Sequence, residues 1–364
     1  MSAVNDRIFE LVAGLVGIPT HEVEDEAQRL IASWLQACGF TWELEEIFPG
    51  RPNLVARRGD GGPLICSHVD VHPPHDHDDP FTYRRDGDNL VGRGVLDAKG
   101  QIAALVAACE AEPDAPALIA ITCDEERGGV GSERLTLPDG PWAHDGGIVL
   151  EPTLFRVCTA QSGHIDLVVR ASAEPSHAYA PEATGSPISA VLAAIDSLET
   201  CAFLSARHPL LPAPRLHVGR IEGGEHLWRR PAAAGAEIGL GLVPGVDADA
   251  ALDEVRSRLD DLGRRWATRG AAFMYEISDA SPAIEVPQDL PIVGQLGKAL
   301  GSSVEPAGMP SWTDAGNLLV HHDIPCVVFG AGDLTSAHSN REWVKADDLV
   351  RLSEVLQRVL RDYG

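Results

Sequence analysis

The stretch "ALIAITCDEERGG", residues 117–129, places three consecutive acids, Asp124, Glu125 and Glu126, directly after an apolar run. A short apolar run of this kind is typical of a buried strand. Burying a carboxylate costs several kcal/mol unless a cation or hydrogen-bond donors compensate its charge. We therefore expect these acids to lie at the end of a buried strand and to face a compensating group.

Four other apolar runs also give way to acids or histidines. They are "LICSHVDVHPP" with His68 and Asp70, "VGRGVLDAKG" with Asp97, "IVLEPT" with Glu151, and "VVFGAGDLTSAHSN" with His338. Any one of these residues could be an ordinary polar cap of a strand, but their recurrence favours a shared site. In open α/β sheets, sites form where the carboxyl ends of strands converge. Two histidines with several carboxylates suit zinc or cobalt better than calcium or magnesium.

The spacing within two pairs of these residues indicates separate roles. His68 and Asp70 are one residue apart, so on an extended strand both side chains point to one face. Asp70 is then expected to hold either the His68 ring or its surroundings, and the spacing leaves this open. Glu125 and Glu126 are adjacent and diverge at a strand end, so we expect one to bind metal and the other to face the substrate.

The alternation of helices and strands predicts an α/β protein with two domains. Up to about residue 160, helical spacing alternates with apolar strands, as in a mixed sheet covered by helices. Residues 163–279 instead repeat two strands and a helix, which favours an antiparallel sheet coated with helices. We predict a discontinuous metal-binding catalytic domain, residues 1–162 and 280–364, interrupted by an inserted α+β (ferredoxin-like) domain, residues 163–279.

The composition excludes several classes of partner. The chain has 364 residues and a formal net charge of −25 at pH 7, which argues against nucleic acid and anionic membranes. No apolar run reaches the roughly 18 residues of a membrane span, and the N-terminus lacks the basic segment of a signal peptide. The seven cysteines are spaced singly, as expected of reduced thiols. We expect a cytoplasmic protein.

Six stretches, in their order and spacing, resemble one known family. They are "HVDVHPP", "GRGVLDAKG", "CDEERGG", "LEPT", "GMPSWTDAG" and "FGAGDLTSAHSN". The family is that of the dinuclear zinc hydrolases, with acetylornithine deacetylases, succinyl-diaminopimelate desuccinylases, aminoacylases and glutamate carboxypeptidase. The resemblance spans nearly the whole chain. It implies a metal-dependent hydrolase of a linear amide bond, two divalent ions (Zn²⁺ or Co²⁺), and a homodimer in which the inserted domain serves for dimerisation and as a lid.

The resemblance also implies a role for each site residue. The implied metal ligands are His68 and Glu151 for one ion, Glu126 and His338 for the other, and Asp97 as the bridge between them. Glu125 is the implied general base, which takes a proton from the water between the ions and passes it to the leaving amine. Asp70 is the implied acid behind the ligands.

Two further features are expected from the resemblance. In the inserted domain, "AEPSHAYAPEATGSP" is similar to the family segment whose histidine reaches into the partner subunit's site. His177 would then stabilise the tetrahedral oxyanion. The family often has a cis peptide after the bridging aspartate, which makes Asp97–Ala98 the expected position in this chain.

The stretch "HPPHDHDD", residues 72–79, adds three histidines beside the predicted site. They could shape the substrate entrance or collect metal, but the composition is more typical of a solvated polar loop. His72, His75 and His77 are therefore left out of the predicted site.

Two positions depart from the family pattern. Trp228 stands at or near the place of an asparagine, and Val243 stands near the place of an arginine that binds a substrate carboxylate. Both changes remove polar contacts expected for a free amino-acid carboxylate. Arg229 or Arg230 is a candidate to replace them.

These observations favour a metal-dependent amidohydrolase that deacylates an N-acyl amino acid, most like acetylornithine deacetylase. A dipeptidase or carboxypeptidase of the same family is the alternative, because it also cleaves an amide beside an amino-acid moiety. Succinyl-diaminopimelate desuccinylase is a third reading, which the altered carboxylate region weakens. A catalytically silent binding protein would lack a metal ligand or the base, and none of these residues is missing from the sequence.

Overall fold

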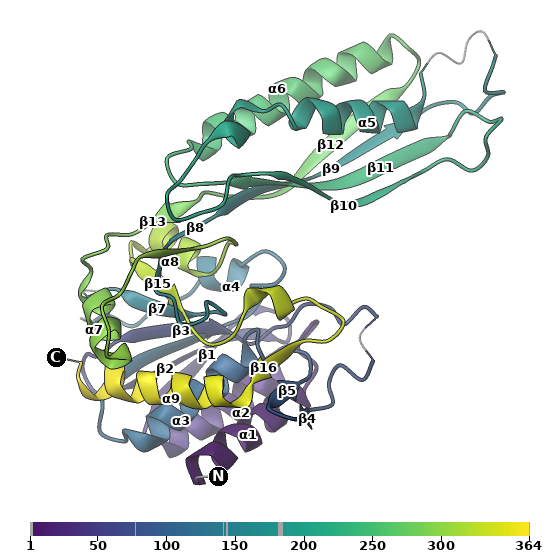
Figure 1. The fold of residues 1–364 in the computed structure, drawn as a ribbon. Helices are drawn as coiled ribbons and strands as arrows, with labels where there is room; N and C mark the ends of the chain where they lie inside the picture. The colour runs from purple at the N-terminus through teal and green to yellow at the C-terminus, as the bar shows by residue number, and fades with distance from the viewer. Residues whose placement is uncertain (1–2, 77, 141, 143–144, 181–184, 364) are drawn as a thin grey trace. The chain divides into compact units, whose positions relative to one another are not determined.

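The computed structural model describes residues 3–76, 78–140, 142, 145–180 and 185–363 (Figure 1). The chain forms two compact units. Unit 1 comprises Met1–Thr159, Val286–Met309 and Thr313–Gly364, and unit 2 comprises Ala160–Glu285 and Pro310–Trp312. The predicted domain boundaries, 162/163 and 279/280, stay a prediction, because a compact unit is defined by its internal contacts and a domain by independent folding.

A mixed sheet forms the centre of unit 1. Its strand order is β1-β2-β6-β3-β7-β15-β8, and β14 also pairs with β8. The strands are β1 (Thr41–Phe48), β2 (Arg51–Arg58), β3 (Leu64–His68), β6 (Ala117–Thr122), β7 (Gly147–Leu150), β8 (Cys158–Gln161), β14 (Ala307–Met309) and β15 (Cys326–Phe329). The neighbours β6, β3, β7 and β15 run parallel and are buried along their whole length. Parallel strands covered on both faces read as continuous apolar runs, which explains the sequence pattern.

Helices cover this sheet (Figure 1). They are α1 (Ala3–Val16), α2 (Asp25–Ala37), α3 (Lys99–Ala111), α4 (Val130–Glu133), α7 (Pro291–Leu300), α8 (Ala315–His322) and α9 (Ala346–Arg361). Helix α3 packs against both α1 and α9, so its residues from Lys99 to Cys109 are all buried.

A small antiparallel sheet in unit 1 joins two distant parts of the chain. Its order is β16-β5-β4, with β16 (Trp343–Lys345), β5 (Asn89–Val91) and β4 (Arg84–Asp86). A short 3-10 turn, Leu334–Ser336, precedes β16. The pairing of β16 with β5 brings the segment after His338 beside the segment before Asp97.

Unit 2 contains a four-stranded antiparallel sheet with the order β10-β11-β9-β12. Its elements follow along the chain as β9 (Gly163–Ser172), α5 (Pro187–Leu198), the 3-10 turn Ala202–Ser205, β10 (Leu216–Gly223), β11 (Ala233–Leu242), α6 (Ala248–Ala267) and β12 (Ala272–Ser281). A further strand, β13 (Ile284–Glu285), pairs with the end of β8. Alternate residues of β9 are buried, and α5 and α6 pack on one face of the sheet. This βαββαβ order is the ferredoxin-like one, and the predicted α/β class with an α+β insert is confirmed.

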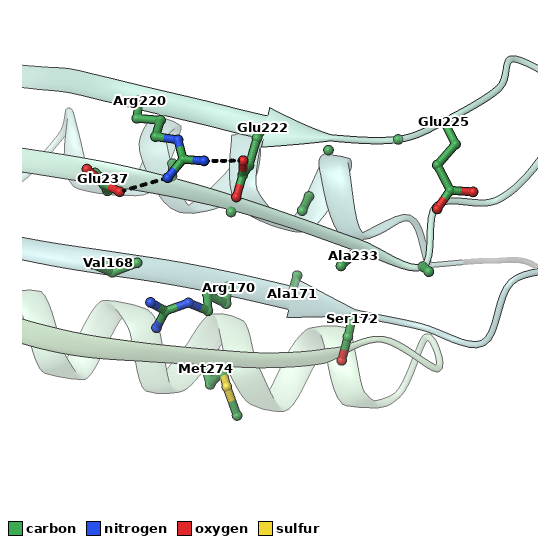
Figure 2. Close-up of a pocket in the computed structure, with 16 residues that line it drawn as sticks. Val168, Arg170, Ala171, Ser172, Arg220, Glu222, Glu225, Ala233, Glu237 and Met274 are labelled. Atoms are coloured by element: carbon green, nitrogen blue, oxygen red, sulfur yellow. Dashed lines mark hydrogen bonds and ion pairs between the residues drawn. The ribbon is translucent and has the colours of Figure 1, made fainter. Parts of the chain in front are cut away.

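The face of the unit 2 sheet that carries the exposed residues of β9 and β11 bears a pocket of about 640 Å³ (Figure 2). Arg220 crosses it and pairs with Glu222 at 2.5 Å and with Glu237 at 3.4 Å. Because both arginines of this pocket, Arg170 and Arg220, already pair with neighbouring glutamates, we assign the pocket no role in the reaction.

Two sequence expectations concern the chain as a whole. All seven cysteines are free thiols, as expected. Among the described residues, no helix has the length and apolar character that a membrane span requires.

A partly exposed ion pair joins two strands of unit 2. The Nε2 atom of His164 on β9 lies 2.6 Å from Oδ2 of Asp279 on β12, and Asp166 lies 4.0 Å from the same ring. Burial alone would lower the pKa of His164, but the bond to Asp279 outweighs it and raises the pKa above its usual 6.5. Burial would raise the pKa of Asp279, but the same bond lowers it below 3.8. Burial raises the pKa of Asp166.

The pair therefore stabilises unit 2 most between pH 3.8 and 6.5. The contribution of His164 is lost as pH rises through its raised pKa, and that of Asp279 is lost as pH falls through its lowered pKa. We predict that His164→Gln lowers the melting temperature by roughly 1–3 °C at about pH 5.5, and by less at about pH 9. Thermal unfolding followed by circular dichroism at the two pH values measures this. An equal loss at both values would contradict the ionic role of the pair.

Candidate metal centre

The parallel strands of unit 1 deliver the predicted ligands to one edge of the sheet. His68 is the last residue of β3, and Glu151 directly follows β7. Glu125 and Glu126 follow β6 after a short turn. Because β3, β6 and β7 run parallel, their carboxyl ends lie at the same edge. The loops before α3 and after β15 add Asp97 and His338.

Two groups of three residues bring their ligand atoms within 4.8 Å of one another, namely His68, Asp97 and Glu151, and Asp97, Glu126 and His338. In the first, His68 Nε2 lies 3.2 Å from Asp97 Oδ1 and 3.5 Å from Glu151 Oε1. In the second, His338 Nε2 lies 2.8 Å from Glu126 Oε2 and 3.5 Å from Asp97 Oδ2. Asp97 thus belongs to both groups and turns one oxygen to each histidine.

The protein compensates only part of the charge of the glutamates in this centre. Burial, followed by neighbouring carboxylates, raises the pKa of Glu151 well above its usual range. The same causes raise the pKa of Glu125. The Oε1 atom of Glu151 is buried without a hydrogen-bond partner among the described residues. Divalent cations would offset this cost, and the imidazole and carboxylate donors are those that zinc and cobalt accept. The residues therefore fit two metal ions.

The two histidines respond to the same carboxylates. Burial alone would lower the pKa of His338, but Asp97 and Glu126 outweigh it and raise the pKa to about 10. Burial also opposes the charge of His68, but Glu125 and Glu151 raise its pKa well above 6.5. Metal ions that bind here would displace these protons, because only neutral imidazole is a ligand.

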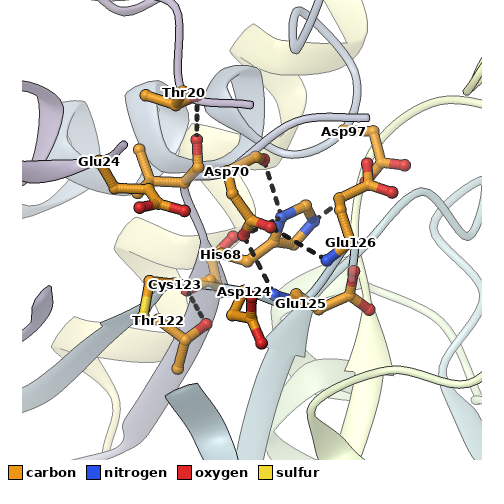
Figure 3. A network of polar contacts seen from close by, with 12 residues as sticks. Thr20, Glu24, His68, Asp70, Asp97, Thr122, Cys123, Asp124, Glu125 and Glu126 are labelled. Carbon is orange, nitrogen blue, oxygen red and sulfur yellow. Dashed lines mark hydrogen bonds and ion pairs between the residues drawn. The ribbon is translucent and has the colours of Figure 1, made fainter. Parts of the chain in front are cut away.

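Asp70 holds both the first histidine and the loop after β6 (Figure 3). Its two carboxylate oxygens accept hydrogen bonds from the backbone N–H groups of Glu125 (3.2 Å) and Glu126 (3.1 Å). The Nδ1 atom of His68 lies 3.1 Å from the Asp70 carbonyl oxygen and 3.5 Å from Oδ1. The spacing in the sequence does not decide whether Asp70 holds the His68 ring or its surroundings. In the structure Asp70 contacts both the ring and the neighbouring backbone.

Asp124 shapes the loop that presents the two glutamates. It has a positive φ of 68°, and its carbonyl oxygen accepts the N–H groups of Arg127, Gly128 and Gly129. Its carboxylate pairs with Arg51 at 2.5 Å, and Arg51 also contacts Glu24 at 2.6 Å. All three charged side chains are buried. The compensating group for the first acid of "CDEERGG" is therefore Arg51.

The two adjacent glutamates diverge as predicted. Glu126 enters the group with His338, whereas neither group of ligand atoms found among the described residues includes Glu125. The expected cis peptide is also present, between Asp97 and Ala98.

The interpretation of His72 as part of a solvated loop is wrong. Its backbone N–H donates to Glu126 Oε1 at 3.0 Å, and its ring stacks on His338 with centroids 4.2 Å apart. Burial, and then the His338 ring, lower the pKa of His72 to about 4. A signal existed in the sequence, because His68, Asp70 and His72 alternate along an extended segment. His75 is exposed, its ring 5.1 Å from that of His72, and His77 lies outside the described residues.

His177 and Trp228 lie in unit 2. The segment around His177 pairs with the segment around Arg229, and both His177 and Trp228 are exposed. The ring of Tyr179 lies 5.8 Å from that of Trp228 and 6.2 Å from that of His177. Val243 is buried beside Ala160 and Leu211, so its side chain is withdrawn from solvent.

The two candidate arginines, Arg229 and Arg230, differ in burial and in the groups that their side chains contact. Arg230 is buried and donates to the backbone carbonyls of Gly185 and Gly270. Arg229 is exposed and pairs with Glu225 at 2.6 Å. Arg230 thus serves the fold of unit 2, and Arg229 remains the candidate for a substrate carboxylate.

Residues 64–362 match the Peptidase family M20/M25/M40. The chain belongs to this family. It is 26% identical over 347 residues to an acetylornithine deacetylase of Vibrio campbellii, which covers 92% of this chain and 90% of that protein. The family confirms the resemblance drawn from the six motifs, and the protein is a metal-dependent hydrolase of amide bonds.

Solved structures share the fold over the whole chain. A tripeptidase from Staphylococcus aureus has a TM-score of 0.80 at 18% identity, with 98% of each chain covered. A dinuclear metal-binding peptidase of the M20 family from Bacillus subtilis has a TM-score of 0.66 at 14% identity, again with 98% of each chain covered.

The two arginines give a direct test of their separate roles. Arg230→Ala leaves buried carbonyl oxygens without donors, so we predict a loss of about 2–3 kcal/mol in the free energy of unfolding. Arg229→Ala removes an exposed ion pair and should change that energy by less than about 0.5 kcal/mol. Urea unfolding of the two variants measures both values. Equal losses would contradict the assignment of Arg230 to the fold.

Proposed function

We propose that this protein removes the acyl group from an N-acyl amino acid, with two divalent ions held in unit 1. The observation that carries the proposal is Asp97, whose two oxygens face two histidines in two overlapping ligand groups. The relatives named acetylornithine deacetylase support an N-acyl amino acid as the substrate class.

In this proposal His68 and Glu151 would hold one ion, Glu126 and His338 would hold the other, and Asp97 would contribute to both. The nitrogen and oxygen donors favour Zn²⁺ or Co²⁺. When bound, the ions polarise the scissile carbonyl and lower the pKa of a water molecule between them.

Glu125 is the proposed general base. It lies beside the ligands without joining either group among the described residues, and its raised pKa suits a carboxylate that must accept a proton near neutrality. The same carboxyl group then gives the proton to the leaving amine. Asp70 would position Glu125 for this step, because its carboxylate accepts a hydrogen bond from the backbone N–H of Glu125.

We further propose a homodimer in which His177 stabilises the oxyanion in the partner subunit's site. Two features of unit 2 support an interface. Strand β10 is an outer strand of its sheet, and its Ile221 is 52% exposed. Leu192 of α5 is 47% exposed. Large apolar side chains on an outer strand and a neighbouring helix are suited to burial against a second copy.

A dipeptidase or carboxypeptidase of the same family is the second candidate, because it also cleaves an amide bond beside an amino-acid moiety. Both candidates use the same ligands and base. They differ in the group on the carbonyl side of the bond, which a dipeptidase requires to carry a free amine. A catalytically silent binding protein is disfavoured, because both ligand groups and Glu125 are complete.

A substrate panel distinguishes these candidates. Amine release is measured with the cobalt-loaded protein on N-acetyl, N-succinyl and N-formyl amino acids and on dipeptides, with a chelator control. We expect chelator-sensitive cleavage of N-acetyl amino acids. Cleavage of dipeptides alone would replace the deacylase with the peptidase, and activity that survives the chelator would contradict a metal-dependent reaction.

The two adjacent glutamates should separate catalysis from metal binding. Glu125→Gln removes the proton acceptor, so we predict two bound ions per chain and a loss of turnover of about 10²- to 10⁴-fold. Glu126→Gln removes a ligand, so we predict the loss of one ion. Metal content measured by mass spectrometry is compared with kcat for each variant. Wild-type turnover in Glu125→Gln would defeat the assignment of the base.

A further inference from the structure

Glu342 is a buried carboxylate to which the proposed reaction gives no role. It is 1% exposed and lies four residues after His338, just before β16. Its Oε1 atom accepts the backbone N–H groups of Leu96 (2.9 Å) and Asp97 (3.1 Å). Its Oε2 atom accepts the N–H of Gly94 at 2.9 Å. One side chain thus takes three hydrogen bonds from the loop that ends in the shared ligand.

Arg93 completes this arrangement from the same loop. Its side chain is 2% exposed, and its Nη1 atom lies 3.1 Å from Glu342 Oε2. Its Nη2 atom donates to the carbonyl oxygen of Ser339 at 3.3 Å. The N–H of Gly92 donates to the carbonyl oxygen of Glu342 at 3.3 Å. The loop before Asp97 and the segment after His338 are therefore joined by these six contacts in the interior.

The loop needs such a support because it has no regular secondary structure. Residues 92–98 form turns and bends between β5 and α3, so the N–H groups of Leu96 and Asp97 have no strand partner. Buried N–H groups without an acceptor are costly. An interior ion pair also gains little stability over apolar packing, since desolvation offsets the attraction. The pair is therefore better explained by the conformation it imposes than by the free energy it contributes.

We propose that Glu342, held by Arg93, is a positioning residue that fixes Asp97 relative to His338 and so sets the affinity of both metal ions. The inference rests on the ligand assignment of the proposed function. It does not depend on the substrate, because its measure is metal binding. Groups that orient metal ligands from behind typically change metal affinity by about 10- to 100-fold when they are altered.

The test is Glu342→Gln, which keeps the shape of the side chain. One carboxylate oxygen is replaced by an NH₂ group, which cannot accept a hydrogen bond from the backbone N–H groups that it faces. Residues 94–97 therefore lose part of their hydrogen bonding to residue 342. Co²⁺ binding to the metal-free full chain is measured by calorimetry, and the visible spectrum of bound Co²⁺ reports ligand geometry. We expect weaker binding of both ions by about 10-fold or more and a changed spectrum.

Arg58→Gln is the matched control. Arg58 is also a largely buried arginine of unit 1, and it donates to the carbonyl oxygens of Cys38, Ala115 and Glu112. These bonds support the fold away from the two ligand groups. We expect Arg58→Gln to lower the melting temperature and to leave Co²⁺ affinity and spectrum as in the wild type.

Arg93→Lys is the second variant, which decides the matter if Glu342→Gln does not fold. Lysine keeps the positive charge but lacks the two Nη groups with which the Arg93 guanidinium contacts both Glu342 and Ser339. Glu342 is then held less firmly, so we expect weakened Co²⁺ binding. A folded Glu342→Gln or Arg93→Lys with wild-type Co²⁺ affinity and spectrum overturns the proposal. Two tightly bound ions in the wild type without amide cleavage would defeat the proposed function and leave this inference standing.

Discussion

Unit 1 is organised around the burial of like charges. The carboxylates of Glu125, Glu126 and Glu151 gather with Asp97 near the carboxyl ends of parallel strands, where burial and mutual repulsion oppose the ionisation of the three glutamates. Among the described residues, His68 and His338 compensate part of this negative charge, and the carboxylates raise the pKa of both histidines. Two divalent ions would supply the remaining positive charge in a small volume. Under the proposed function, the two ions would thus offset the cost of burying these acids and also supply the chemistry.

Buried ion pairs hold the loops that carry this charge. Arg51 connects Glu24 to Asp124 under the loop of Glu125 and Glu126. Arg93 connects Glu342 to the segment before Asp97. In both cases an arginine on one segment meets a carboxylate on another that is distant in sequence. Irregular loops have no ladder of backbone hydrogen bonds, so interior side chains must accept or donate instead.

Unit 2 bears on the choice of substrate. Val243 is buried and Arg230 is bound to backbone carbonyls, so neither side chain is free to meet a substrate carboxylate. The exposed residues of this region include His177, Trp228 and Arg229, and Arg229 is paired with Glu225. Under the proposed function, Arg229 is therefore the remaining candidate of unit 2 for a substrate carboxylate.

Much of the fold and of the centre could be predicted from the sequence. The apolar runs ending in His68, Thr122 and Leu150 predicted buried strands of a mixed sheet, and the residues after them were predicted as ligands, because residue type and periodicity are local properties of the chain. The family resemblance assigned their roles. Spacing alone does not decide whether Asp70 holds His68 or the backbone of the two glutamates. It also does not place His72, because the stacking of His72 on His338 depends on where the loop after β15 returns.

The ion pairs that hold the loops of the centre could not be predicted from any local sequence pattern. Arg51 and Asp124, or Arg93 and Glu342, carry no motif that links them, and Arg230 was as plausible a substrate ligand as Arg229 in the sequence. Tertiary structure decided these pairs and the burial of Arg230, because contacts between segments that are far apart in the chain exist only after the strands have assembled.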